Sequence, residues 1–226
     1  MNKLESSLKN MLLSLTLITA FAGALLGGVY ALTKDPIADA QQLKQDRAKA
    51  EVLSQEGNYT FTTVEGGRNV VVYKAFDESG DLAGYSVQTS DSNAFNGLIS
   101  LMVGFDTTGV ITGYTVLSQS ETPGLGANMV DWFKTNKGKQ CIVGLNPSEK
   151  KFFVSKDGGD VDAITAATIT SRAFLRAVKL ASDELGAVRL FDELDEVAVQ
   201  QEADSTFSLS KINITEEQIH KLFEQQ

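Results

Sequence analysis

Hydroxyl side chains cluster in the segment DAITAATITS, residues 162–171, directly ahead of a stretch with helical periodicity. These hydroxyl residues and the small residues between them are Thr165, Ala166, Ala167, Thr168, Thr170 and Ser171. The first N–H groups of a helix have no partner inside it, and the helix dipole favours negative charge there. The segment could therefore bind a phosphate or carry one on a hydroxyl. The same pattern is also typical of an ordinary helix start capped by a hydroxyl.

A second segment, SETPGLGANMVDWF at residues 120–133, has the composition of an exposed ligand-binding loop. Pro123, Gly124 and Gly126 predict a tight turn that displays Leu125. Apolar residues follow at helical spacing, namely Met129, Trp132 and Phe133. A flat aromatic ligand could rest on such a loop. A surface turn followed by a core-facing helix is the alternative interpretation.

The chain has few side chains for other kinds of chemistry. It contains one histidine, His220, and one cysteine, Cys141, so no His-based triad and no conventional zinc or copper site can form. Asp160 and Asp162 lack the ordered series of oxygen ligands of a calcium loop, and we expect no metal site. The net charge of −9 and the absence of basic stretches argue against nucleic-acid binding. If the chain takes part in redox chemistry, a cofactor must carry it.

An uncharged apolar stretch at residues 11–33 predicts a transmembrane helix. At about 1.5 Å per residue it is roughly 34 Å long, enough to cross a hydrocarbon core of about 30 Å. The apolar region of a signal peptide usually has only about 7–15 residues. Cleavage after Val29-Tyr30-Ala31 is the alternative. The basic residues near the span do not decide its orientation, because most of them follow it.

The remaining elements predict an α+β domain with an antiparallel sheet and packed helices. Residues 34–56 read as a helix leaving the membrane, with helix-forming residues from Pro36 to about Ser54. Strands are expected at residues 69–76, 84–90, 110–120, 140–145 and 150–155, whereas residues 97–105 suit a buried strand or helix.

The C-terminal part of the chain should be helical and then acidic. A helix is expected at residues 171–185, with Gly186 as its stop. The capping-box pattern at Thr215 and Gln218 predicts a short terminal helix. The expected organisation is a terminus (1–10), a span (11–33), a linker helix (34–56), the main domain (57–190) and an acidic tail (191–226).

Taken together, the two motifs resemble a known family. ETPGLG followed by D-x-x-T-small-A-T is similar to the FMN-binding domain in the G subunit of the Rnf electron-transport complex, and in its relative, the C subunit of the sodium-translocating NADH:quinone reductase. The resemblance extends over most of the chain, including the N-terminal span and the segment GLISLMVGFDTTGVITGYTVL. The length and the N-terminal residues are more similar to the Rnf protein.

The resemblance implies a covalent FMN, held by a phosphoester to Thr168 that a flavin transferase makes. Recognition by that transferase would involve Asp162, Thr165, Ala167 and Thr168. The implied cofactor-binding residues are Glu121, Thr122, Gly124, Leu125, Thr165, Ala166, Ala167, Thr170 and Ser171. The chain departs from the family at Ala166, where glycine is usual, and at Gln119, where histidine is frequent.

The resemblance also implies a function. The chain would be a single-pass inner-membrane subunit, with a cytoplasmic N-terminus and a periplasmic domain, that relays electrons between reduced ferredoxin and NAD in a complex that transports Na⁺ or H⁺. Its partners would be the D subunit above all, the A and E subunits, and the flavin transferase. The alternatives are the quinone-reductase C subunit, a flavin-free extracytoplasmic binding module, and an assembly subunit that has lost its flavin.

Overall fold

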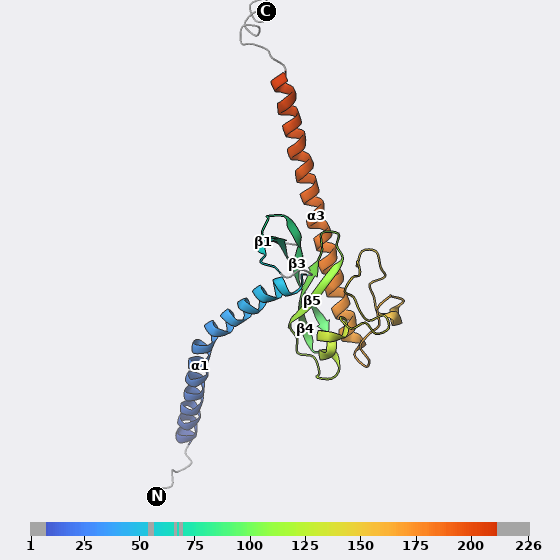
Figure 1. Ribbon diagram of the computed structural model, residues 1–226. Helices are drawn as coiled ribbons and strands as arrows, with labels where there is room; N and C mark the ends of the chain where they lie inside the picture. The colour runs from blue at the N-terminus through green and yellow to red at the C-terminus, as the bar shows by residue number, and fades with distance from the viewer. Residues whose placement is uncertain (1–7, 54–56, 66, 68–69, 212–226) are drawn as a thin grey trace, which may run out of the picture.

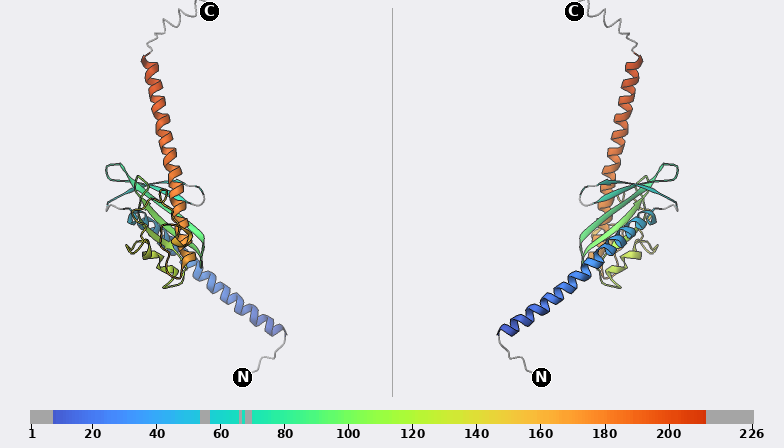
Figure 2. Two further views of the ribbon diagram at one scale, coloured as in Figure 1. Left: turned by 90° about the vertical axis from the view of Figure 1, so that its right-hand side faces the viewer. Right: turned by 90° about the vertical axis from the view of Figure 1, so that its left-hand side faces the viewer.

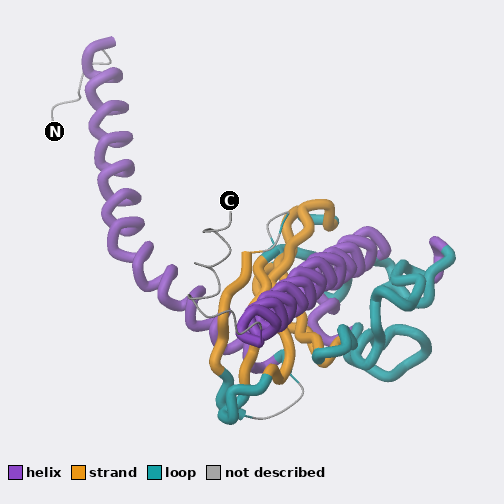
Figure 3. Tube along the Cα trace, turned by 90° about the horizontal axis from the view of Figure 1, so that it is seen from above, coloured by secondary structure: helices purple, strands orange, loops and turns teal. Residues whose placement is uncertain are grey.

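The computed structural model describes residues 8–53, 57–65, 67 and 70–211, with side chains as far as Asp192 except at residue 65. The first element, α1 (Leu8–Glu51), is one continuous helix that contains both the apolar stretch and most of the linker helix. Its apolar part is long enough to cross a membrane, and none of it is buried inside the protein. The helix bends along its length (Figures 1 and 3), and Pro36 lies inside it. Proline removes one helical hydrogen bond and is a common cause of such a bend.

Five antiparallel strands form one sheet in which each strand pairs with the next along the chain. They are β1 (Thr60–Glu65), β2 (Val71–Phe76), β3 (Leu82–Ala94), β4 (Gly97–Phe105) and β5 (Ile111–Ser118). Residues 97–105 are therefore a strand, which settles the ambiguity left by their composition. β1 was not predicted. The expected α+β fold with an antiparallel sheet is confirmed.

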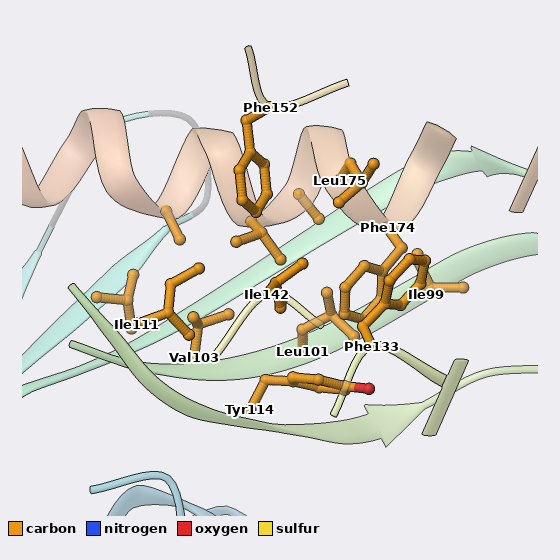
Figure 4. Packing of buried hydrophobic residues seen from close by; sticks show 14 of the residues in the cluster. Ile99, Leu101, Val103, Ile111, Tyr114, Phe133, Ile142, Phe152, Phe174 and Leu175 are labelled. Atoms are coloured by element: carbon orange, nitrogen blue, oxygen red, sulfur yellow. The ribbon is translucent and has the colours of Figure 1, made fainter. Parts of the chain in front are cut away.

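One face of the sheet packs against the first part of α3 (Thr168–Lys211), and the main core lies between them (Figure 4). Alternate residues of β4 point into this core, because neighbouring side chains of a strand lie on opposite faces: Ile99, Leu101, Val103 and Phe105. Phe174 of α3 stacks on Phe133 with ring centroids 4.4 Å apart, and meets Tyr114 edge-on at 4.9 Å. This packing fixes the start of α3 over the sheet.

The other face of the sheet holds the C-terminal end of α1. Ala48 and Val52 pack there against Tyr73, Met102 and Leu117. The helix end comes so close that a Cβ at Gly104 would collide with the carbonyl oxygen of Val52. The Thr112 hydroxyl donates a 2.6 Å hydrogen bond to the same oxygen. The anchor helix is thus joined to the sheet by direct packing.

Two of the expected strands and both expected ends of the following helix are wrong. Residues 140–145 and 150–155 form turns and an isolated bridge, not strands, although Ile142, Phe152 and Val154 are fully buried in the main core. The helix starts at Thr168 and not at residue 171. It also continues through Gly186, because Leu185 and Val188 on either side remain packed in the core. The expected helix from Thr215 lies outside the described residues.

The two long helices leave the sheet domain in different directions (Figures 1 and 2). The apolar half of α1 extends from one side, and the C-terminal half of α3 projects from the opposite side. The start of α3, where the hydroxyl cluster lies, is at the end of the domain nearer to the apolar half of α1.

Candidate flavin site

The hydroxyl cluster forms a compact turn at the start of α3. The backbone N–H of Ala167 donates to the carbonyl oxygen of Ile164 at 3.0 Å. The Ser171 hydroxyl accepts a 2.9 Å bond from the N–H of Ile164 and donates to the carbonyl oxygen of Ala167 at 3.0 Å. Ser171 is fully buried. Its hydroxyl, expected to contact the cofactor, shapes the turn from inside the fold.

Ala166 adopts a backbone conformation that suits glycine better. Its φ is 61°, and it is the one non-glycine residue with positive φ in the described part of the chain. This left-handed conformation costs an L-residue with a Cβ roughly 1–2 kcal/mol relative to the right-handed one. The turn that presents Thr168 therefore gives a physical reason for glycine at position 166. Alanine is the smallest residue that replaces it.

The second motif forms the expected tight turn. The N–H groups of Leu125 and Ala127 both donate to the carbonyl oxygen of Thr122, at 3.1 and 3.2 Å. Gly124 has a φ of 76° and lies exposed at the outside of the turn. A short helical segment follows in η1 (Gly126–Asn128) and α2 (Met129–Trp132). Leu125 is displayed as expected, with 41% of its surface exposed.

A buried hydrogen bond joins the two motifs. The Thr170 hydroxyl donates to Oε2 of Glu121 at 2.6 Å, and both side chains are buried. Gly126 packs directly against this pair, and a Cβ there would collide with Glu121 Oε2 and lie 2.7 Å from Thr170 Oγ1. Only glycine therefore lets the loop approach the helix so closely.

The two motifs enclose a cavity of about 300 Å³, a size found among small-molecule sites. Seven of the predicted site residues line it: Glu121, Thr122, Leu125, Ala166, Ala167, Thr168 and Thr170. Three further residues complete the lining: Phe95, Gly126 and Ile169. Gly124, Thr165 and Ser171 are not part of the lining. The glycine spacing of the loop could have indicated Gly126, but no local signal marks Phe95.

Asp162 is not part of the cavity lining, and it holds neighbouring loops together. Its Oδ2 accepts a 2.9 Å bond from the N–H of Lys139, and its Oδ1 accepts a 2.7 Å bond from the Ser155 hydroxyl. The bond from the Lys139 N–H, followed by the one from Ser155, holds the pKa of Asp162 below its usual range. Trp132 Nε1 donates to the carbonyl oxygen of Asp162 at 3.1 Å. The first residue of the motif is thus an ionised part of the scaffold.

The cavity has an apolar part and a polar part. Leu125, Ile169 and Phe95 supply apolar area that could contact a flat ring, while Thr168 and the first turn of α3 supply a hydroxyl and a positive dipole end that could accommodate a phosphate. Gly126 and the small Ala166 and Ala167 leave room that larger side chains would fill. Among the described residues no group of His, Cys, Asp and Glu could hold a metal ion.

Comparisons with known proteins assign the segment that contains this cavity to a known family. Residues 95–183 match the FMN-binding domain family. The G subunit of the ion-translocating oxidoreductase complex of Methanosarcina acetivorans is 34% identical over 189 residues, which are 81% of this chain and 97% of that protein. The corresponding G subunits of Aliivibrio fischeri and Escherichia coli K12 are 32% and 33% identical and cover 78% and 75% of this chain, which spans 89% and 86% of them.

One solved structure, NqrC of Shewanella oneidensis, is 22% identical with a TM-score of 0.37, covering 58% of this chain and 66% of that one. Fold, cavity and family match define the chain as a protein with an FMN-binding domain, joined to a helix long enough to span a membrane. The chain belongs to the family of G subunits of ion-translocating oxidoreductase complexes, and the predicted resemblance is confirmed.

Proposed function

We propose that this chain is the membrane-anchored flavoprotein subunit of an Rnf-type complex and carries FMN as a phosphoester on Thr168. The complex passes electrons between reduced ferredoxin and NAD and couples their transfer to Na⁺ or H⁺ transport. This subunit relays the electrons and does not itself bind ferredoxin or NAD. FMN supplies the redox chemistry, because it can accept and donate electrons singly or in pairs.

The observation that carries the proposal is the position of Thr168. It is the first residue of α3, it is half-buried, and it lines the same cavity as the loop of the second motif. A phosphate on its oxygen would lie at the positive end of the helix dipole. The adjacent residues Ala166 and Ala167 leave the hydroxyl accessible to a transferase. The donor of this step would be a flavin dinucleotide: the new bond joins Thr168 Oγ1 to the phosphorus of its FMN half, the P–O bond of the diphosphate breaks, the other half leaves as a nucleoside monophosphate, and the hydroxyl proton is released.

A covalent bond has a clear advantage for a domain outside the cytoplasm. A flavin bound non-covalently with a Kd of about 1 nM and an association rate constant near 10⁶ M⁻¹s⁻¹ would dissociate about once in 10³ s. In the periplasm it would then diffuse away from the complex. The phosphoester prevents this loss and keeps the ring near its electron partners.

The proposed location and partners follow from the same family. The N-terminus would be cytoplasmic, α1 would cross the inner membrane, and the sheet domain would be periplasmic. The D subunit would be the main partner, with the A and E subunits nearby, and a flavin transferase would act during maturation. The start of α3 lies toward the apolar half of α1 (Figure 2), which supports an electron partner in the membrane.

Mass spectrometry of the tryptic peptide of residues 157–172 tests the proposal. The protein is made together with its flavin transferase in a host's own membrane. We expect the peptide to gain the mass of FMN less one water, and the gain to disappear in Thr168→Ala. Thr168→Ser keeps a hydroxyl at the same place and serves as the conservative control. An unmodified wild-type peptide from membranes with active transferase would contradict the proposal.

A further inference from the structure

The tip of the β3–β4 hairpin lies at the cavity although neither motif contains it. Ala94 pairs with Gly97, so Phe95 and Asn96 are the two residues of the turn. Phe95 lines the cavity together with Leu125 and Thr168. Nevertheless 65% of its surface is exposed. A large aromatic side chain at the mouth of a cavity thus keeps most of its surface available for a ligand.

Hydrogen bonds hold this hairpin tip in place. The backbone N–H of Asn96 donates to Oε1 of Glu121 at 2.7 Å, and its side-chain Nδ2 donates to the carbonyl oxygen of Ser120 at 3.0 Å. The other carboxylate oxygen of Glu121 accepts the 2.6 Å bond from Thr170. One buried carboxylate therefore joins three segments: the hairpin tip, the loop and the start of α3. Tips of hairpins are usually mobile, but this one is fixed against the site.

We propose that Phe95 forms an aromatic wall of the flavin site and that Glu121 is the positioning residue that holds it there, an inference that rests on the function proposed above. Flat aromatic groups prefer offset or edge-to-face contact with one another, and the flavin ring is such a group. Phe95 would cover part of the ring and limit its contact with water. Leu98 lies on the same hairpin and is 56% exposed, but it is not part of the cavity lining.

Excited-state quenching of the flavin distinguishes these two positions. An excited flavin takes an electron from tyrosine or tryptophan at contact distance and loses its fluorescence, whereas phenylalanine is too difficult to oxidise. In the FMN-loaded full chain in detergent, we expect Phe95→Tyr and Phe95→Trp to shorten the flavin fluorescence lifetime several-fold. The matched variants Leu98→Tyr and Leu98→Trp should leave it unchanged. Equal effects at positions 95 and 98, or no effect at 95, would overturn the proposal.

The role of Glu121 is tested in the Phe95→Tyr background. Glutamine at position 121 keeps an oxygen acceptor for the Asn96 N–H, so Glu121→Gln should preserve the short lifetime. Glu121→Ala removes both bonds, and the molecules that carry FMN should recover a longer lifetime. An equally short lifetime in the alanine variant would show that Glu121 does not position Phe95. The peptide mass separates the two hypotheses: a chain without FMN overturns the proposed function as well, whereas a loaded chain without quenching overturns only the wall.

Discussion

At the scale of single residues, Ala166 is the site position where side chain and backbone conformation conflict. Its φ of 61° costs an L-residue roughly 1–2 kcal/mol, while glycine loses about 0.4–1 kcal/mol more conformational entropy on folding than alanine. We therefore expect Ala166→Gly to raise the free energy of unfolding by about 0.5–1 kcal/mol. Urea denaturation of the full chain in detergent, followed by Trp132 fluorescence, measures the change. The peptide assay should show that FMN attachment is retained.

The neighbouring alanine provides the control for this prediction. Ala167 is buried and does not have a positive φ. In Ala167→Gly the added backbone freedom is not offset by relief of strain, so this variant should be less stable than the wild type. If both glycine variants lost the same stability, the positive φ at position 166 would not strain the alanine measurably.

At the scale of elements, the contact between α1 and the sheet depends on a close approach at Gly104. A methyl group there would collide with the carbonyl oxygen of Val52, which also accepts the bond from Thr112. We expect Gly104→Ala to move the helix end and lower the free energy of unfolding by about 1–3 kcal/mol, the usual cost of inserting a group into a packed region. Urea denaturation in detergent measures this loss.

Gly113, which pairs with Gly104 across β4 and β5, is the matched control. A Cβ at Gly113 would lie 3.1 Å from the Val52 oxygen, a contact that a small shift relieves. Gly113→Ala should therefore cost clearly less than Gly104→Ala. Similar losses for the two variants would indicate a general intolerance of side chains on this face and no specific docking of α1.

The sequence predicted those elements whose periodicity reflects one-sided burial. The strands at residues 71–76, 82–94 and 111–118 lie close to the expected ranges, because residues facing α3 alternate with residues on the other face. The expected strands at residues 140–145 and 150–155 do not form, because Ile142, Phe152 and Val154 fill the core from turns, and a short buried apolar run has the composition of a strand. Gly186 predicts a helix stop, but the packing of Leu185 and Val188 on both sides of it keeps the helix intact.

The sequence predicts the part of the candidate site that comes from two short continuous segments of the chain. The two segments identified by their glycines and hydroxyls do meet around one cavity. Phe95 could not be predicted, because its place at the cavity depends on the pairing of β3 with β4 and on the bond from Asn96 to Glu121. The sequence also does not predict that the Ser171 side chain points inward, because the turn brings the Ile164 N–H within hydrogen-bond distance of its hydroxyl.

At the scale of the whole molecule, the arrangement of the two long helices relates the site to the membrane. The start of α3 is at the end of the domain nearer to the apolar half of α1, and the C-terminal half of α3 projects from the opposite side (Figure 1). If α1 spans the bilayer, the flavin site faces the membrane side of the domain. The membrane partner of the proposed function would then reach the site only from the side of the bilayer on which the domain lies.

The side on which the domain lies can be measured with cysteine labelling, because the chain has only Cys141 to remove. In a Cys141→Ser background, Lys137→Cys places a thiol at an exposed position of the domain, and Lys3→Cys places one ahead of the span. A domain in the periplasm predicts that a membrane-impermeant maleimide labels the first variant in intact spheroplasts and the second only after permeabilisation. The reverse labelling pattern would place the domain in the cytoplasm. A dissociated flavin would then stay in the cell, so a phosphoester on Thr168 would not be needed to prevent its loss.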